Sequence, residues 1–340
     1  MRALVCHGYG PIEGLKVEDI PKPSPAPGEI LVKVGAAGVS FAAMLGIQGK
    51  HQNKPPLPFV PGNEIAGEVA ALGEGVTDLK VGQRVATGGS RGGFAEYCVT
   101  IAANAVPIPD AMPYAQATNF PTLYPTAYGA LKWKADLRPG EVLLVHGAGG
   151  GSGLTGIEVG KAMGAVVIAS AGGADKLAAA KEAGADHLID YRTEDLRTKV
   201  LELTGGRGAD VIYDPVGGSA FDASLRCVAP EGRLIPMGFA SGVIPQIPAN
   251  ILLVKNVTVI GFYYGYYNGW GGKTAPTSKE AAALAKRRAM VADAQTELMR
   301  WFTEDKLKAT IAGSFDLGDW VKAFKLIEER TVVGKAVLVP

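Results

Sequence analysis

The chain has 340 residues, and one residue in five is glycine or proline (46 and 22). Hydrophobic residues make up 47% of it and no G-x-y period accompanies the glycines, which excludes collagen-like and disordered chains. The net charge of +1 leaves no electrostatic signature of binding to nucleic acid or to an anionic membrane surface. No apolar run reaches the roughly 18–20 residues of a membrane span, and the length indicates two domains.

The first third of the chain contains short strands interrupted by glycine and proline, such as 29–34 and 66–72. Prolines at positions 21, 23, 25 and 27 are too close together for a helix or a central strand. This part of the chain therefore predicts an all-β unit of the barrel type.

From residue 141 onward, apolar strands alternate with helices, which include 154–163 and 176–183. Six strands with helical crossovers predict an α/β domain of the Rossmann type, a doubly wound parallel six-stranded sheet with right-handed connections. The predicted strands are Val142–His146, Val166–Ser170, His187–Tyr191, Asp210–Asp214, Arg233–Met237 and Asn256–Phe262.

An aromatic, glycine-rich segment (262–276) and a long amphipathic helix (278–305) follow this alternation. The last strand, 334–339, is expected to pair with the N-terminal unit, so that the Rossmann domain is inserted within the β domain. The predicted domains are 1–124 plus 263–340, and 125–262.

The three cysteines, Cys6, Cys98 and Cys227, are isolated and show no C-x-x-C spacing. A disulfide framework and a cysteine zinc lobe are therefore not expected. A cytoplasmic setting is expected instead. The four histidines are not paired at ligand spacing, so no metal site is predicted. The N-terminus lacks the apolar core of a signal peptide.

The densest glycine cluster, 145–153, directly follows an apolar strand and precedes an apolar helix. Small residues in such a turn let a pyrophosphate approach the backbone and rest on the helix N-terminus. The alternative is a merely tight turn, and the spacing differs from a strict G-x-G-x-x-G. The candidate dinucleotide-binding residues are Gly147, Gly150, Gly151, Ser152 and Gly153.

The end of the second strand indicates which dinucleotide is bound. NAD-selective sites place an acid there, whereas this chain has Ala171-Gly172-Gly173 and then Lys176. A cation without a nearby carboxylate suits a 2′-phosphate, so the predicted cofactor is NADPH. Asp175 argues mildly against this, and Lys176 has the alternative of being a solvated helix residue.

Motifs along nearly the whole chain resemble those of the medium-chain dehydrogenase/reductase superfamily, in particular its zinc-independent quinone oxidoreductase (ζ-crystallin-like) branch. The resemblance implies a Rossmann domain inserted in a GroES-like β-barrel catalytic domain. The motifs are 27–32 (PGEILV), 38–41 (GVSF), 61–67 (PGNEIAG), 81–85 (VGQRV), 93–97 (GFAEY), 126–128 (TAY), 183–187 (AGADH) and 214–218 (DPVGG).

The zinc alcohol dehydrogenases of this superfamily carry a Cys near residues 38–40 and Gly-His-Glu where this chain has Gly62-Asn63-Glu64. Both ligands are missing here, and so is the four-cysteine lobe after Val85. Alcohol oxidation by a zinc Lewis acid is therefore disfavoured, and hydride delivery to an already electrophilic acceptor is expected.

The resemblance also implies roles for individual residues. The 2′-phosphate would contact Gly172, Lys176 and Tyr191, although Tyr191 has the alternative of a core residue. The nicotinamide would contact Thr126, which has the alternative of a helix N-cap. The remaining implied cofactor contacts are Met237, Gly238, Phe239 and Lys335.

The chain departs from the branch pattern on the acceptor side. Where the branch usually has the motif Gly-Val-Asn-Phe-x-Asp, this chain has Ser40 in place of the Asn and Ala43 in place of the Asp. His51 stands where a Tyr is common, and its imidazole suits proton transfer near neutral pH, although an exposed loop histidine is the alternative. Ser40, His51 and Thr126 are the candidate catalytic residues.

Two further segments have two interpretations each. The aromatic stretch 262–270 is either a lid over a planar acceptor or a dimer interface. The run Lys286-Arg287-Arg288 is either the polar face of the long helix or a phosphate-binding patch for a coenzyme A ester.

The sequence therefore predicts a cytoplasmic, metal-free NADPH-dependent quinone oxidoreductase that works as a homodimer on a small-molecule acceptor. An NADPH-dependent C=C reductase of 2-alkenals, enones or enoyl-CoA thioesters is the alternative enzyme. An NADPH-binding structural protein, of the crystallin kind, is the alternative from another class.

Overall fold

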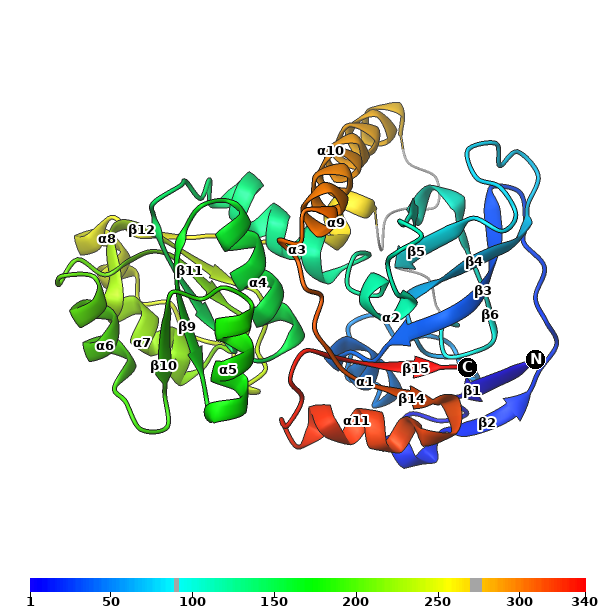
Figure 1. Cartoon of the computed structure of the whole chain (residues 1–340), viewed down its shortest axis with the longest axis horizontal. Coiled ribbons are helices and arrows are strands. Elements are labelled where there is room, and N and C mark those ends of the chain that lie inside the picture. The colour runs from blue at the N-terminus through cyan, green and yellow to red at the C-terminus, as the bar shows by residue number, and fades with distance from the viewer. Residues whose placement is uncertain (89–91, 270–276) are drawn as a thin grey trace. The chain divides into compact units, whose positions relative to one another are not determined.

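The computed structural model describes residues 1–88, 92–269 and 277–340. The chain divides into two compact units, Met1–Thr122 with Ala309–Pro340, and Leu123–Lys308. The second unit is thus inserted into the first, which confirms the predicted arrangement (Figure 1).

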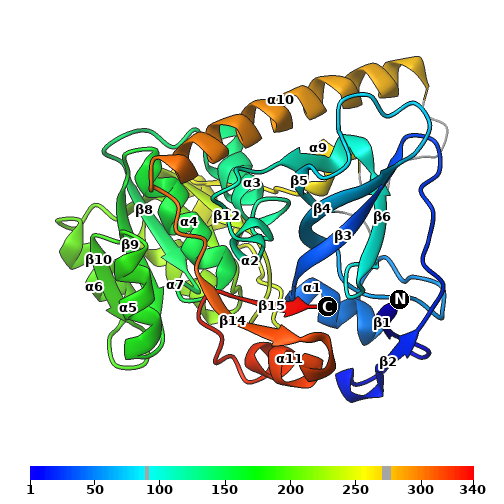
Figure 2. The same cartoon turned by 45° about the vertical axis from the view of Figure 1, so that its right-hand side comes forward.

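Strands from both ends of the chain form the first unit. Its larger sheet has the order β14-β15-β3-β4-β5-β7, β6 pairs with β3, and β1 pairs with β2 in a separate sheet. β15 is antiparallel to β3, which confirms the predicted pairing of the last strand, and Figure 2 shows α11 beside β14 and β15. The strands are β1 (Arg2–Val5), β2 (Lys16–Asp19), β3 (Glu29–Gly38), β4 (Glu64–Leu72), β5 (Arg84–Gly88), β6 (Tyr97–Ile101), β7 (Ala105–Pro107), β14 (Ile311–Asp316) and β15 (Lys335–Val339), and the helices are α1 (Phe41–Ile47), α2 (Tyr114–Ala117) and α11 (Trp320–Glu328) with short turns η1 (Ile12–Gly14), η2 (Ala102–Asn104) and η4 (Leu317–Asp319).

The core of the first unit also joins both ends of the chain. Leu4, Ile30 and Leu338, from β1, β3 and β15, are buried in one hydrophobic cluster. Phe94 meets Phe324 of α11 edge to face, with ring centroids 5.9 Å apart. Hydrophobic packing as well as strand pairing therefore holds the C-terminal segment in this unit.

Six parallel strands form the sheet of the second unit, in the order β10-β9-β8-β11-β12-β13. Chain order reverses between β8 and β11, and α4 and α5 cover one face of the sheet while α6 and α7 cover the other (Figure 1). This is the predicted doubly wound sheet, and such sheets bind ligands at the carboxyl ends of the strands beside the reversal. The strands are β8 (Val142–His146), β9 (Val166–Ala171), β10 (His187–Asp190), β11 (Ala209–Asp214), β12 (Val228–Pro236) and β13 (Thr258–Val259), and the helices are α3 (Leu123–Tyr128), η3 (Gly129–Lys134), α4 (Gly151–Ala162), α5 (Ala174–Glu182), α6 (Leu196–Leu203), α7 (Ser219–Cys227), α8 (Ala249–Lys255), α9 (Gly265–Asn268) and α10 (Ser278–Thr303).

The sixth strand is shorter than the predicted 256–262. Asn256 ends α8 in the left-handed conformation, with φ of 54°, so an extended strand begins only after it. The chain then leaves the sheet after Val259, and the prediction was wrong for the flanking residues.

Residues 263–308 group with the second unit, whereas the sequence placed them with the β domain. The reason is aromatic packing that the sequence pattern does not reveal. Tyr128 donates a hydrogen bond to Glu297 of α10 and lies 5.7 Å from the ring of Trp301. Tyr267 of the aromatic stretch lies 4.8 Å from the ring of Trp133. Trp270, also part of that stretch, lies outside the described residues.

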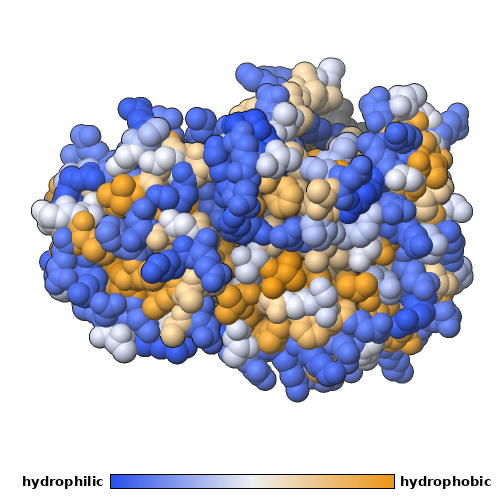
Figure 3. All heavy atoms as spheres, viewed as in Figure 1, coloured by the Kyte–Doolittle hydropathy of each residue, from blue (hydrophilic) through white to orange (hydrophobic). Residues whose placement is uncertain are grey.

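Figure 3 shows hydrophilic side chains surrounding several separate hydrophobic patches on one face of the molecule. Within the ranges that the structure describes, no helix combines the length and apolar character needed to cross a membrane.

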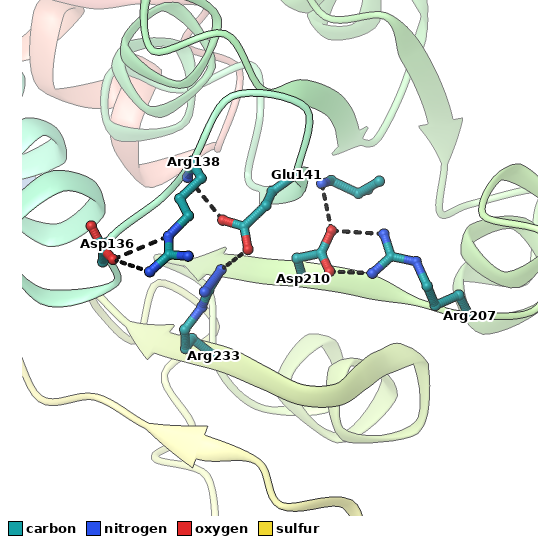
Figure 4. Close-up of polar contacts among 7 residues, drawn as sticks. Asp136, Arg138, Glu141, Arg207, Asp210 and Arg233 are labelled. Atoms are coloured by element: carbon teal, nitrogen blue, oxygen red, sulfur yellow. Dashed lines mark hydrogen bonds and ion pairs between the residues drawn. The ribbon is translucent and has the colours of Figure 1, made fainter.

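A cluster of charged side chains lies at the amino ends of β8 and β11 and includes Arg233 of β12 (Figure 4). Asp210 of β11 accepts hydrogen bonds from Arg207 and, at 2.7 Å, from the Val142 amide of β8. Arg233 of β12 donates to Glu141 at 2.8 Å. Burial favours a raised pKa for Asp210, but the hydrogen bonds from Arg207 and Val142 and the charges of Arg207 and Arg233 outweigh it, so the pKa is lowered.

We expect Asp210→Asn to lower the free energy of unfolding by about 1–3 kcal/mol at pH 7, because Arg207 loses its charged partner. A lowered folded-state pKa stabilises the protein above the unfolded value of about 3.9, and this stabilisation disappears as the pH falls through the folded value. The difference in free energy of unfolding between the parent protein and Asp210→Asn should therefore become smaller in acid. Urea unfolding at pH 7 and near pH 3.5 measures it.

Asp136→Asn is the matched control, since Asp136 belongs to the same cluster but its side chain is 71% exposed, against 15% for Asp210. We expect Asp136→Asn to lower the free energy of unfolding by less than about 0.5 kcal/mol. Equal losses in the two variants would contradict a stabilising role for the buried carboxylate.

Candidate functional site

The turn between β8 and α4 favours glycine at position 147 and requires it at position 153. Gly147 has a φ of 58°, in the left-handed region. A Cβ at Gly153 would lie 2.2 Å from the Gly147 carbonyl oxygen, so no side chain fits there. A Cβ at Gly150 would meet only that same oxygen, at 3.6 Å. The turn is therefore compact inside and open above Gly150.

The first turn of α4 has the features of an anion site. Gly150 is its N-cap residue and provides no side-chain cap, so the amide groups of Gly151, Ser152 and Gly153 have no capping side chain. The hydroxyl of Ser152 lies 3.0 Å from the hydroxyl of Tyr213, which turns this side chain toward β11. An anion at the turn would thus meet backbone N–H groups of a 12-residue helix, as a pyrophosphate requires.

His146, the last residue of β8, is buried directly before this turn. Its Nε2 lies 2.7 Å from the Ser224 hydroxyl, which itself donates to the Ala220 carbonyl, so Nε2 is the donor. Burial lowers the pKa of His146, although the Asp214 charge opposes the shift. This side chain anchors the strand end to α7.

Lys176 of α5 lies against the glycine turn. A Cβ at Gly149 would lie 2.5 Å from both Cβ and Cγ of Lys176, so the lysine stem occupies the space that glycine leaves. The structure therefore brings this predicted cofactor residue to the turn.

Gly172 and Gly173, at the end of β9, lie beneath Tyr191 and Arg192. A Cβ at Gly172 would lie 2.7 Å from Arg192 Nε and 2.8 Å from the Tyr191 hydroxyl. The Asp190 carboxylate ties the backbone at the end of β9 to the residues after β10, because it accepts hydrogen bonds from the amides of Gly173 at 3.3 Å and Arg192 at 3.0 Å. Tyr191 is 56% exposed and therefore not a core residue.

Sequence reasoning missed Arg192. The available signal was its position directly after the third strand, because β10 neighbours β9 in a parallel sheet and their carboxyl ends meet. Arg192 thus brings a guanidinium to the strand end where an NAD-selective site would hold an acid, and the stem of Lys176 packs against Gly149 of the neighbouring turn.

The carboxyl end of β12 carries the predicted nicotinamide contacts. The Met237 amide donates to the Asp214 carbonyl at 2.7 Å, so Met237, Gly238 and the exposed Phe239 follow the strand at the same edge as the glycine turn. Thr126 lies inside α3, not at its N-cap, and α3 packs on α4.

Ser40 and His51, in the first unit, keep hydrogen-bonding capacity. Ser40 caps α1 by accepting from the Ala43 amide at 3.2 Å, which leaves its O–H to donate. His51 Nδ1 lies 3.1 Å from the Asn53 amide and 3.4 Å from the Asn53 carbonyl oxygen, and in the shorter contact Nδ1 accepts, which leaves the proton of the neutral ring on Nε2.

Lys335 forms a buried ion pair within the first unit. Its Nζ lies 2.7 Å from Glu64 Oε2 and donates to the Thr118 carbonyl at 2.9 Å. A Cβ at Gly38 would lie 2.2 Å from Lys335 Cε, so the ion pair requires glycine at the end of β3. Breaking one partner of such a pair leaves a buried charge, which gives Lys335 a structural role regardless of any ligand.

Asn63 is a second residue that sequence reasoning did not select. It directly precedes β4, whose residue Ile65 pairs with Ala37, so it lies at the sheet end where Ser40 follows β3. Its Oδ1 is buried and has no hydrogen-bond partner among the residues that the structure describes. A buried carbonyl oxygen without a donor is suited to accept one from a ligand.

Among the residues that the structure describes, no group of three or more His, Cys, Asp or Glu side chains is arranged to hold a metal ion. Cys6, Cys98 and Cys227 all lie among the described residues, are buried and form no disulfide, and burial raises the pKa of Cys98 to about 12.

Family models match both parts of the chain. The model described as alcohol dehydrogenase GroES-like domain matches residues 26–110, and the one described as zinc-binding dehydrogenase matches residues 151–280.

Curated relatives match nearly the whole chain. A quinone oxidoreductase-like protein 2 homolog of Nematostella vectensis is 39% identical over 340 residues, which is 99% of this chain and 88% of the relative. Quinone oxidoreductase-like protein 2 of Bos taurus is 34% identical, over 95% of this chain and 88% of the relative.

Among solved structures, the Escherichia coli quinone oxidoreductase complexed with NADPH superimposes with a TM-score of 0.88, at 30% identity and with both chains fully covered. The relatives and the fold together show that this chain is an oxidoreductase of the medium-chain dehydrogenase/reductase superfamily and belongs to its quinone oxidoreductase branch.

Proposed function

We propose that the protein is an NADPH-dependent quinone oxidoreductase. The observation that carries the cofactor assignment is a pair of basic side chains: the Lys176 stem packs against Gly149, and the Arg192 guanidinium lies beside Gly172. A 2′-phosphate favours such cations, and the end of β9 offers it glycines instead of a carboxylate. Asp175 is exposed, and the Asp190 carboxylate accepts hydrogen bonds from the backbone amides of Gly173 and Arg192.

The fit of the dinucleotide rests on the glycine turn and the strand ends. Gly150 and Gly151 would receive the pyrophosphate, and Tyr191 would lie beside the 2′-phosphate together with Lys176 and Arg192. Thr126 and Met237, Gly238 and Phe239 would contact the nicotinamide. When bound, the cofactor supplies the hydride that reduces the acceptor. Lys335 is left out of this proposal, because its ammonium group is already paired with Glu64.

On the acceptor side, the chain offers hydrogen-bond donors, which suits an acceptor whose oxygen gains negative charge on reduction. The Ser40 O–H is free to donate while its oxygen caps α1. The names of the relatives favour a quinone. The Nε2–H of His51 favours a second candidate, reduction of a conjugated C=C bond, because that reaction needs a proton donor.

The proposal includes a homodimer and a cytoplasmic location. β13 is a two-residue edge strand, and α8, which precedes it in the chain and contacts β12, exposes Leu253 and Val254, each 77% accessible. An exposed apolar helix beside a sheet edge suits a second copy of the same chain. Three buried cysteines that form no disulfide suit a reducing compartment.

Removing either cation tests the cofactor assignment. We expect Lys176→Ala and Arg192→Ala each to raise the Kd of NADPH about tenfold, which corresponds to about 1.4 kcal/mol, while the Kd of NADH changes less than about twofold. Fluorescence titration of each nucleotide measures both values.

Lys181→Ala is the control for charge alone, since Lys181 is an exposed residue of the same helix. It should leave both constants unchanged. Equal weakening of NADPH and NADH in the Lys176 and Arg192 variants would show that the 2′-phosphate is bound elsewhere.

A panel of quinones, enones and enoyl-CoA thioesters tests the reaction, with NADPH consumption as the readout. We expect the highest kcat/KM for a quinone, and a roughly tenfold lower value in Ser40→Ala, because a lost hydrogen bond to a developing oxyanion costs at least about 1.4 kcal/mol. Ser40→Asn keeps both a helix cap and a donor and should retain activity.

A preference for enones or enoyl-CoA would select the C=C reductase instead. NADPH binding without turnover of any acceptor would select the structural NADPH-binding protein.

Light scattering tests the assembly. We expect a mass about twice the 35.3 kDa of the chain, and a monomer for the double variant Leu253→Asp/Val254→Asp, since a charge cannot be buried unpaired in an apolar interface. Leu203→Asp, at an exposed apolar position of α6, is the control. A monomeric parent protein, or a double variant that remains dimeric, would exclude this interface.

A further inference from the structure

Glu158 is a buried carboxylate on α4 with two hydrogen-bond donors on one oxygen. Its Oε2 accepts from the Tyr124 hydroxyl at 2.5 Å and from the Lys308 amide at 3.0 Å. Glu158 and Tyr124 are both almost fully inaccessible. A buried carboxylate depends on such donors, because burial without them is strongly unfavourable.

The two donors belong to the segments that join the units. The chain enters the second unit between Thr122 and Leu123, and leaves it between Lys308 and Ala309. Tyr124 is thus the second residue after the entry, and Lys308 is the last residue before the exit. A single carboxylate therefore holds both joining segments, defined here as residues 122–124 and 307–309.

The exit segment shows further constraints. Asp305 and Ala309 adopt φ values of 58° and 48°, in the left-handed region that non-glycine residues rarely occupy. Leu307 between them is buried, and Lys308 pairs with Asp305 at 2.7 Å. Such backbone conformations persist only where surrounding contacts hold them. The hydrogen bond from the Lys308 backbone amide to Glu158 is one of these contacts.

Glu158 also lies on the helix that begins at the glycine turn. α4 starts at Gly151, and Glu158 is seven residues further along the same rigid element. Helix α4 packs closely on the sheet, because Cβ atoms at Gly156 and Gly160 would approach Tyr213 and Leu143 to 3.2 and 2.4 Å. An event at the start of α4 is therefore transmitted to Glu158 through one stiff, well-packed helix.

We propose that Glu158 is a positioning residue that couples occupation of the dinucleotide turn to the order of both joining segments. This inference rests on the proposed NADPH site. Binding at the turn stabilises α4, and Glu158 passes that stabilisation to Tyr124 and Lys308. A purely structural anchor would hold the segments equally well with and without the nucleotide.

Hydrogen exchange of the full-length protein, with and without saturating NADPH, separates the two roles. In the parent protein we expect NADPH to slow exchange at least threefold in peptides covering 147–156, 123–128 and 305–310. In Tyr124→Phe/Glu158→Leu, which removes the carboxylate together with the hydroxyl that it would orphan, slowing should remain at 147–156 and disappear at the joining segments. Glu158→Gln keeps an acceptor oxygen and should restore most of it.

The matched control is Tyr128→Phe/Glu297→Leu. It removes another tyrosine–glutamate hydrogen bond of the same unit, between α3 and α10, that involves neither joining segment. It should leave the NADPH-dependent slowing intact. If the Glu158 double variant does not fold, Tyr124→Phe carries the test, and slowing at 123–128 should fall at least by half while that at 305–310 persists.

If NADPH slows hydrogen exchange at 147–156 of the parent protein but not at the joining segments, the coupling is contradicted, whereas the proposed NADPH site is supported. Equal slowing in the parent and in the Glu158 double variant would also overturn the coupling. No slowing at 147–156 in the parent protein would overturn both the cofactor site and the coupling that depends on it.

Discussion

The backbone of the β8–α4 turn sets the conditions for the rest of the second unit. A side chain at Gly153 would place its Cβ 2.2 Å from the Gly147 carbonyl oxygen, so the helix can begin this close to the strand only with glycine there. The close approach points the first amides of α4 at the carboxyl edge of the sheet, where chain order reverses between β8 and β11. The proposed nucleotide contacts from the glycine turn and from the ends of β9, β10 and β12 are arranged around that edge.

The glycines serve two purposes around this edge. Gly153 makes the turn possible, whereas Gly149 and Gly172 leave room for side chains that reach in from α5 and from the end of β10. The Lys176 stem and the Arg192 guanidinium lie close to these glycines because nothing larger occupies those positions. In the first unit, Gly38 does the same for the buried ion pair of Lys335 and Glu64. In both units, a basic side chain packs against the backbone at a glycine, in the space that a Cβ would otherwise fill.

The sequence was sufficient for most of the fold, because apolar strands such as 142–146 and 166–171 alternate with helices at a regular spacing. Lys176 was found because the acid expected at the end of the second strand is missing. Arg192 and Asn63 were not found, since their positions matter only through neighbours on other strands. The placement of 263–308 failed for the same reason, as contacts such as Tyr128 with Trp301 join residues that are far apart in the chain. Long-range packing is what a single sequence leaves undetermined.

The central claim is that the end of β9 binds a 2′-phosphate. The most direct measurement is the ratio of the NADH and NADPH dissociation constants of the parent protein, by titration calorimetry at two ionic strengths. The two cations predict a ratio of about 100 or more at low salt that falls as salt is added, because their interaction with the phosphate is largely electrostatic. A ratio near one, or tighter binding of NADH, would contradict the account.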